Sequence, residues 1–192
     1  KWMKPSRRPS SFMADLLGSK AIMQPSPLGT VGIIAPWNFP IGMVFYPTAS
    51  VLAAGNRIMV KPSEFTPNTS SLIRELIGSI FHPDEILVLE GDHEIGAQLI
   101  TLNFDHIFFT GSPEIGKIVM DAAAKNLTSI TLELGGKNHA IVDETANLKD
   151  AAEKILWSKY VNAGQTCIAV NHVFVHESCY ESFLSYSKNV FN

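Results

Sequence analysis

Short runs of β-branched and other apolar residues alternate along the chain with longer stretches whose apolar positions recur at helical spacing. The short runs predict strands at residues 30–35, 57–61, 86–89, 105–109, 128–134, 139–142 and 171–176. The longer stretches predict helices at about residues 40–54, 69–81, 93–101, 113–125, 148–161 and 178–190. The interior strands are apolar on both faces, as in a parallel sheet with helices on both sides. The alternation therefore predicts an α/β fold with a doubly wound parallel sheet.

The same pattern divides the chain into segments. Residues 1–8 are expected to be a helix end and linker, and residues 9–27 an exposed β-arm. The strand–helix alternation runs through residues 28–136 and restarts near 135–137, at a predicted domain boundary. Residues 137–192 are too few for a typical domain and stop on an unfinished α/β unit. We therefore expect a fragment that contains one complete domain and the beginning of a second α/β domain.

Composition narrows the possible functions. The net charge is −3 and the longest basic run is Arg7-Arg8, so we expect no nucleic-acid partner. Hydrophobic residues make up 46% of the chain, enough for a substantial core. The two cysteines, Cys167 and Cys179, form no CxxC pair and no cluster with metal-ligand spacing. This argues against a disulfide framework or a metal site and favours a reducing, cytoplasmic setting.

Residues 21–56 contain no charged side chain, a feature that membrane segments share. Prolines break this stretch into short pieces, at Pro25, Pro27, Pro36, Pro40 and Pro47. A spanning helix needs roughly 20 consecutive apolar residues. We therefore expect a buried strand and a buried helix here, and no membrane span.

The turn between the strand at 105–109 and the next helix is close to a phosphate-binding loop. Gly111, Gly116 and Lys117 have the spacing of such a loop, but Ile118 stands where an ATP site needs Ser or Thr. Pro113 also removes one backbone N–H group. An ATP site is therefore disfavoured, although the turn and helix start can still face another anion. The alternative is a tight turn without a ligand.

Lys61 and Glu64 follow the strand at 57–61. A carboxylate just beyond a strand can accept hydrogen bonds from ribose hydroxyls, and a lysine there can contact a hydroxyl or a phosphate. The alternative is a solvated charged turn.

Three further residues are suited to covalent chemistry. Cys167 lies among small residues that leave its sulfur accessible, and a helix beginning nearby would favour the thiolate; otherwise it is a buried, inert cysteine. Glu133 ends an apolar strand, where desolvation would raise its pKa and make it a better base, unless it faces water at a sheet edge. Asn38, between Pro36 and Pro40, can stabilise an oxyanion or simply shape a turn.

Taken together, five motifs resemble the NAD(P)⁺-dependent aldehyde dehydrogenase superfamily. In chain order they are PWNFP, KPSE, FTGS-x3-G, ELGGK and GQTC. The stretches QPSPLGTVGIIAPWNFP and AAGNRIMVKPSEFTP are most similar to the coniferyl-aldehyde dehydrogenase branch. The resemblance implies a Rossmann-like cofactor domain followed by the start of a catalytic domain, and oxidation of an aldehyde to its acid.

The resemblance also implies a role for each matching residue. Cys167 would be the nucleophile that forms a thiohemiacetal and then a thioester, Asn38 and the Cys167 backbone N–H would hold the oxyanion, and Glu133 would activate water. The remaining candidates would bind NAD, with NADP possible, and they are Ile34, Trp37, Lys61, Glu64, Gly111, Ser112, Gly116 and Leu134.

The sequence also departs from many members of this superfamily. Pro47 stands where many relatives carry a lysine, as it does in the class 3 and coniferyl-like branches. The C-terminal Glu-x-Phe-Gly-Pro region, whose glutamate binds the nicotinamide ribose, is absent, so the resemblance implies that the chain alone is inactive. It further implies a homodimer or homotetramer when full length, with the 9–27 arm in the oligomer contact. The competing hypotheses are a P-loop nucleotide hydrolase and a non-catalytic structural relative.

Overall fold

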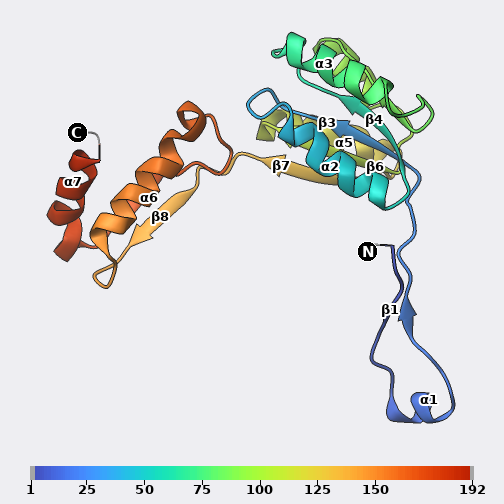
Figure 1. Cartoon of the computed structure of the whole chain (residues 1–192), viewed down its shortest axis with the longest axis horizontal. Helices are drawn as coiled ribbons and strands as arrows, with labels where there is room; N and C mark the ends of the chain where they lie inside the picture. Colours follow the sequence, from blue (N-terminus) through green and yellow to red (C-terminus); the bar gives the residue numbers. More distant parts are fainter. Residues whose placement is uncertain (1–2, 191–192) are drawn as a thin grey trace. The chain divides into compact units, whose positions relative to one another are not determined.

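The computed structural model describes residues 3–190, and its largest element is a five-stranded sheet (Figure 1). The strands lie in the order β5-β4-β3-β6-β7, and the pairs β3–β4, β3–β6 and β4–β5 are parallel. Their bounds are β3 Thr30–Ile34, β4 Arg57–Lys61, β5 Ile86–Val88, β6 His106–Gly111 and β7 Ser129–Leu134. Because the chain adds β4 and β5 on one side of β3 and then β6 and β7 on the other, the predicted doubly wound sheet is confirmed.

Four helices connect these strands, and three of them contact the sheet closely. Helix α2 packs against β3 and β4, α3 against β5, and α5 against β6 (Figure 1). The helix bounds are α2 Gly42–Ala53, α3 Pro67–Gly78, α4 His93–Leu99 and α5 Pro113–Lys125. Apolar side chains on alternate positions of β3 and β4, including Val31, Ile33 and Val60, are fully buried between sheet and helices.

Polar side chains fix the start of the central strand β3. The buried Asn56 accepts hydrogen bonds from the backbone N–H groups of Leu28 and Gly29. Asp105 accepts a hydrogen bond from the Thr30 N–H at 2.7 Å. Gly29 has φ +137°, and a Cβ there would meet the Asp105 carboxylate, so this position requires glycine. These contacts join the beginnings of β3, β4 and β6.

The chain divides between Glu133 and Leu134 into two compact units. In the second unit, β8 (His139–Val142) pairs in parallel with β9 (His172–Val175). Helices α6 (Leu148–Tyr160) and α7 (Tyr180–Asn189) pack together over a core that contains Val142, Ala152, Cys179 and Phe183. Short 3₁₀ segments at Val161–Gly164 and Glu177–Cys179 precede β9 and α7, respectively. The division lies beside the boundary predicted near residues 135–137.

The N-terminal segment differs from the prediction. Ser6–Arg7 (β1) pairs antiparallel with Ile22–Met23 (β2), although residues 1–8 were expected to be a helix end and linker. The expected β-arm contains a short helix, α1 (Phe12–Leu16), and the Ser11 hydroxyl caps its N-terminus by accepting from the Ala14 N–H. Two residues at the start of the predicted segment 1–8 (1 and 2) and two at the end of the predicted segment 137–192 (191 and 192) lie outside the described residues. Between residues 3 and 190, no helix has the length and apolar character needed to cross a bilayer.

Candidate functional site

The predicted cofactor residues of the first unit gather at the carboxyl ends of three neighbouring strands. The register pairs Ile34 at the end of β3 with Lys61 at the end of β4, and with Phe109 near the end of β6. Gly111 ends β6, so it lies at the same edge of the sheet. From β3 the chain continues to β4 on one side, and from β6 it continues to β7 on the other side of the sheet. Doubly wound sheets bind ligands where the strand order reverses in this way, at the carboxyl ends of the strands.

Lys61 is the most deeply buried charged side chain at this edge. It is 4% exposed, and its Nζ lies 2.8 Å from Glu64 Oε2 and 3.3 Å from the Pro62 carbonyl oxygen. Gly96 of α4 lies alongside, where a Cβ would come 3.5 Å from the Lys61 side chain. The sheet thus holds an ammonium group in place with its carboxylate partner on the solvent side.

The Glu64 carboxylate is partly exposed and keeps its charge in this pair. Partial burial raises the pKa of Glu64, but the hydrogen bond and positive charge of Lys61 outweigh it, so the pKa lies below the usual value. The solvated-turn alternative therefore describes Glu64 only in part, because its orientation is set by a buried partner.

The turn from β6 into α5 has the expected strand–turn–helix geometry. A Cβ at Gly111 would come 2.5 Å from the Phe109 ring, so only glycine fits without moving that ring. Ser112 caps α5, since its Oγ accepts from the Ile115 N–H at 3.3 Å, and Pro113 occupies the first turn. Gly116 is buried on the helix face toward the sheet. The Ser112 hydroxyl therefore has a structural role besides any contact with a ligand.

Trp37 and Asn38 lie in the bend between β3 and α2. Trp37 is 45% exposed and Asn38 is half-buried. Ile34, at the end of β3, is also half-buried. Ile34 pairs with Lys61 in the sheet register, and Trp37 and Asn38 follow it in the chain.

Two environments were considered for Glu133, a desolvated strand end and a sheet edge that faces water. It lies on β7, the edge strand of the sheet, and is exposed. The expected desolvation is therefore not found, and the alternative of a sheet edge that faces water describes Glu133. An apolar sequence alone does not reveal which strand occupies the edge. Leu134, the next residue, is half-buried and begins the second unit.

The two cysteines occupy opposite environments. Cys167 is exposed, whereas Cys179 is buried in the core of the second unit and its thiol donates to the His176 carbonyl oxygen at 3.3 Å. In the described chain no helix begins at Cys167, so the helix N-terminus considered for it is not present. The accessible sulfur is the feature that a nucleophile requires.

The backbone just before Cys167 is unusual. Asn162, Ala163 and Gly164 all have positive φ, at 53°, 56° and 78°. A residue other than glycine in this region costs about 1–2 kcal/mol, and such conformations are often found at functional sites. A Cβ at Gly164 would also come 3.1 Å from the Lys159 carbonyl oxygen. The turn therefore has one position that requires glycine and a strained alanine beside it.

Asn138 is a residue that the sequence reasoning missed. Its side-chain Nδ2 donates to the carbonyl oxygens of Cys167 at 2.6 Å and Ala169 at 3.3 Å. Its own carbonyl oxygen accepts from the Asn171 N–H at 2.7 Å. The only signal in the sequence is an amide side chain directly after ELGGK, which does not reveal its distant partners.

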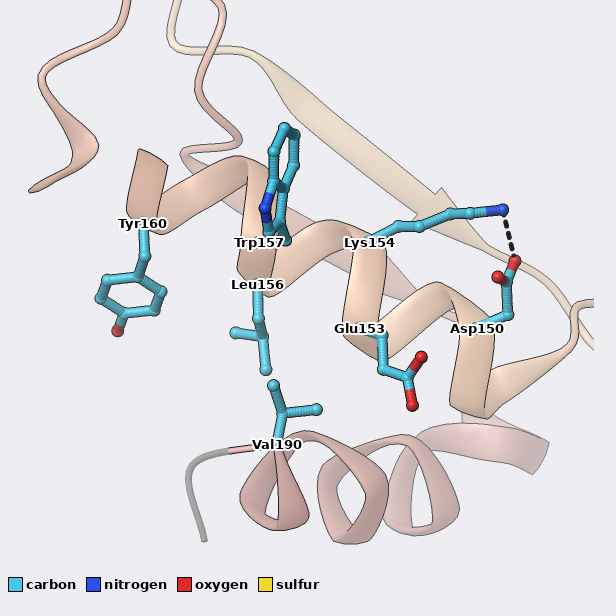
Figure 2. A pocket seen from close by; sticks show the side chains of 7 residues that line it. All are labelled: Asp150, Glu153, Lys154, Leu156, Trp157, Tyr160 and Val190. Carbon is cyan, nitrogen blue, oxygen red and sulfur yellow. Dashed lines mark hydrogen bonds and ion pairs between the residues drawn. The ribbon is translucent and has the colours of Figure 1, made fainter. Parts of the chain in front are cut away.

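An open pocket is lined by side chains of α6 and by Val190, which follows α7 (Figure 2). Asp150, Glu153, Lys154, Leu156, Trp157, Tyr160 and Val190 line it. Lys154 pairs with Asp150 on the same helix, with Nζ 2.8 Å from Oδ2. None of the predicted cofactor or catalytic residues lines this pocket, so we do not assign the chemistry to it.

The candidate residues thus form two groups. The first unit holds Asn38, Glu133 and the cofactor residues up to Gly116, and the second holds Leu134, Asn138 and Cys167. The first unit has a sheet edge with the ammonium group of Lys61 held by Glu64, and the second has an exposed thiol on a loop bonded by Asn138.

The family model described as "Aldehyde dehydrogenase family" matches residues 5–191. The chain belongs to this family. A probable coniferyl aldehyde dehydrogenase of Pseudomonas aeruginosa is 46% identical over 99% of the chain, which corresponds to 40% of that aldehyde dehydrogenase. A 4,4'-diaponeurosporen-aldehyde dehydrogenase of Staphylococcus aureus is 48% identical over 88% of the chain and 37% of its own length.

Solved structures of aldehyde dehydrogenases agree with the fold. Staphylococcus aureus AldH in a substrate-bound state has a TM-score of 0.91 and 44% identity over 99% of this chain and 41% of its own. An NADP-dependent enzyme of Escherichia coli has a TM-score of 0.86 and 32% identity over 98% of this chain and 39% of its own. The chain spans about 40% of the length of the curated relatives it matches. The predicted membership of the aldehyde dehydrogenase family, the similarity to coniferyl aldehyde dehydrogenases and the α/β fold are thereby confirmed.

Proposed function

We propose that this protein oxidises an aldehyde to the carboxylic acid with NAD(P)⁺, through a thiohemiacetal and a thioester on Cys167. The observation that carries the proposal is the family match over residues 5–191, within which Cys167, Glu133 and Asn38 are all present. The similarity to coniferyl aldehyde dehydrogenases favours an aromatic aldehyde of that type as substrate. A homo-oligomer and a cytoplasmic location remain part of the proposal.

The residues at the sheet edge fit a nicotinamide dinucleotide. Lys61 and Glu64 offer a donor and an acceptor suited to ribose hydroxyls, and their ion pair keeps them oriented. Gly111, Ser112 and Gly116 would face the pyrophosphate at the start of α5, where the helix dipole favours an anion. The three remaining candidates, Ile34, Trp37 and Leu134, would flank the cofactor site.

Each catalytic residue would perform one step. The Cys167 thiolate adds to the aldehyde carbon, and the Asn38 amide and Cys167 backbone N–H donate to the oxygen as it becomes negative. The chemistry that a nicotinamide cofactor supplies when bound is acceptance of a hydride from that carbon, which leaves a thioester on Cys167. Glu133 then takes a proton from water as the water attacks the thioester, and the acid leaves as the thiolate is restored. The exposure of Cys167 and Glu133 is compatible with access by substrate and water.

The test uses the protein expressed from its complete reading frame, with coniferyl aldehyde and NAD⁺. Cys167→Ser is expected to abolish aldehyde-dependent NADH formation, because a serine hydroxyl is a far weaker nucleophile than a thiolate. Cys179→Ala is the matched control, since that thiol is buried in the core. Unchanged turnover in Cys167→Ser would refute the mechanism.

A further inference from the structure

The loop that carries Cys167 has little regular structure of its own. The 3₁₀ segment ends at Gly164 and β9 begins at His172, so residues 165–171 depend on contacts with other parts of the second unit. Asn138, immediately before β8, bonds this loop at three points, through the Cys167 and Ala169 carbonyls and the Asn171 N–H. All of these residues belong to one compact unit.

The chemistry of this clamp requires a carboxamide. The two side-chain partners are both carbonyl oxygens, which only accept, so the NH₂ group of Asn138 must face them and can donate one hydrogen to each. An aspartate would place a carboxylate against the same two oxygens with no hydrogen to donate. A Cβ at Gly136 would lie 3.3 Å from Asn138 Oδ1, so the neighbouring glycine leaves room for the outward side of the amide.

We infer that Asn138 is a positioning residue for the nucleophile, and this inference rests on the proposed function of Cys167. The Cys167 carbonyl and N–H flank the same Cα that bears the thiol. Holding the carbonyl therefore limits rotation about that Cα, and with it the direction of the sulfur and of the N–H that would meet the oxyanion. The strained turn at Asn162–Gly164 comes directly before this loop in the chain. Asn138 therefore holds a loop whose preceding backbone is already under strain.

The inference predicts a change in kcat more than in substrate affinity. In the protein from the complete reading frame, Asn138→Ala should lower kcat for aldehyde oxidation by about 10- to 100-fold, the range expected for a misplaced reacting group. The aldehyde KM should stay within roughly threefold, because Asn138 acts on the loop and not on the substrate. Asn138→Asp should lose at least as much, and Asn138→Ser, which keeps one donor, should fall between Asn138→Ala and the wild type.

Asn171→Ala is the matched control, because Asn171 is exposed on the same loop and meets Asn138 through its backbone. It should keep kcat within about twofold of the wild type. Amide hydrogen exchange provides a readout independent of activity. In Asn138→Ala, exchange at residues 167–171 should accelerate roughly two- to tenfold, the loss expected for an ordinary hydrogen bond. Exchange in the core around Ala152 and Phe183 should be unchanged.

The outcomes separate this inference from the proposed function. Activity in Cys167→Ser would overturn both. An inactive Cys167→Ser together with wild-type kcat and loop exchange in Asn138→Ala would overturn only the role of Asn138. Faster exchange throughout the second unit in Asn138→Ala, with Asn138→Ser equally affected, would also overturn it, because Asn138 would then stabilise the fold as a whole.

Discussion

At the scale of single residues, the turn before Cys167 places an alanine where glycine is preferred. Ala163 has φ 56° between Asn162 and Gly164, which also have positive φ. Asparagine tolerates this region better than alanine does, and glycine best, so Ala163 carries most of the local strain. The bond from Asn138 to the loop is among the contacts of the second unit that can hold this turn in place.

Ala163→Gly should therefore stabilise the turn. We expect a gain of about 0.5–1 kcal/mol in the local opening free energy, because removing Cβ relieves more strain than the added freedom of the unfolded chain costs. Hydrogen exchange of the amides after residue 163 measures this directly. Ala163→Val is the opposing variant, since a β-branched side chain fits this region worse, and slower exchange in it would contradict the strain argument.

Glu64 is the residue on which the choice between NAD⁺ and NADP⁺ should depend. Its lowered pKa keeps it charged at neutral pH, and a carboxylate beside the ribose would repel a 2′-phosphate. Glu64→Gln removes that charge and leaves the ammonium of Lys61 free to attract the phosphate. We expect the ratio of kcat/KM for NADP⁺ to that for NAD⁺ to rise roughly tenfold, equivalent to about 1.4 kcal/mol.

Initial rates with both cofactors, measured in the protein from the complete reading frame, give this ratio. Glu75→Gln, a substitution of the same kind at an exposed position of α3, is the control. An unchanged ratio in Glu64→Gln would show that Glu64 does not face the ribose.

At the scale of elements, a histidine joins β6 to the edge strand β7. Ser129 Oγ donates its hydrogen to the Asp105 carbonyl oxygen, so it accepts from His106 Nδ1–H at 2.8 Å. His106 Nε2 then accepts from the Thr131 hydroxyl at 3.0 Å. Burial lowers the pKa of His106, since the charged ring is less well solvated at this position. The neutral ring thus bridges the two strands.

This arrangement makes the β6–β7 pairing sensitive to acid. Because the folded pKa lies below the unfolded value of about 6.5, the unfolded strand binds the proton more readily. The stability contributed by His106 is therefore complete above about pH 6.5 and decreases as the pH falls below it. Exchange at residues 129–134, corrected for the intrinsic effect of pH, should accelerate between pH 7 and pH 5. His106→Gln should remove this acceleration, whereas His82→Gln, at an exposed position, should not.

The bounds of helices and strands were predicted better than the burial and the hydrogen-bond partners of single residues, for a physical reason. The helix at Pro113–Lys125 and the strands at Arg57–Lys61 and His139–Val142 have the predicted bounds, because apolar periodicity reflects burial within one element. The exposure of Glu133 depends on strand order, and the partners of Asn138 depend on which carbonyls the fold brings opposite it. Both are long-range properties that a local pattern does not contain.

The short helix α1 was missed for a different reason. Its five residues include Phe12 and Leu16, and both are exposed. A helix without a buried face has no amphipathic pattern to detect, and the Ser11 cap alone is a weak signal.

At the scale of the whole molecule, the candidate residues are divided between the two compact units. The first holds the predicted cofactor residues of the sheet edge, and the second holds Cys167 and Asn138. The relatives extend well beyond the length that this chain matches. By the family resemblance, the glutamate that binds the nicotinamide ribose belongs to a C-terminal region that has no counterpart among these 192 residues.

These 192 residues alone should consequently form little or no NADH from coniferyl aldehyde and NAD⁺. We expect turnover at or near the background rate, because positioning of the reacting carbon can contribute many orders of magnitude to the rate. An absorbance assay at saturating cofactor measures it, with the protein from the complete reading frame as the positive comparison. Robust NADH production by the chain alone would contradict the expectation.

The two-stranded sheet of the second unit has a consequence for handling the protein. In the described chain β8 and β9 pair only with each other, so each leaves one row of backbone N–H and C=O groups without a neighbouring strand. Ile141 and Phe174 on these strands are also largely exposed. Open strand edges beside apolar side chains recruit strands from other molecules. Refolding this chain at high concentration should therefore favour aggregation, and dilute conditions should favour recovery of folded protein.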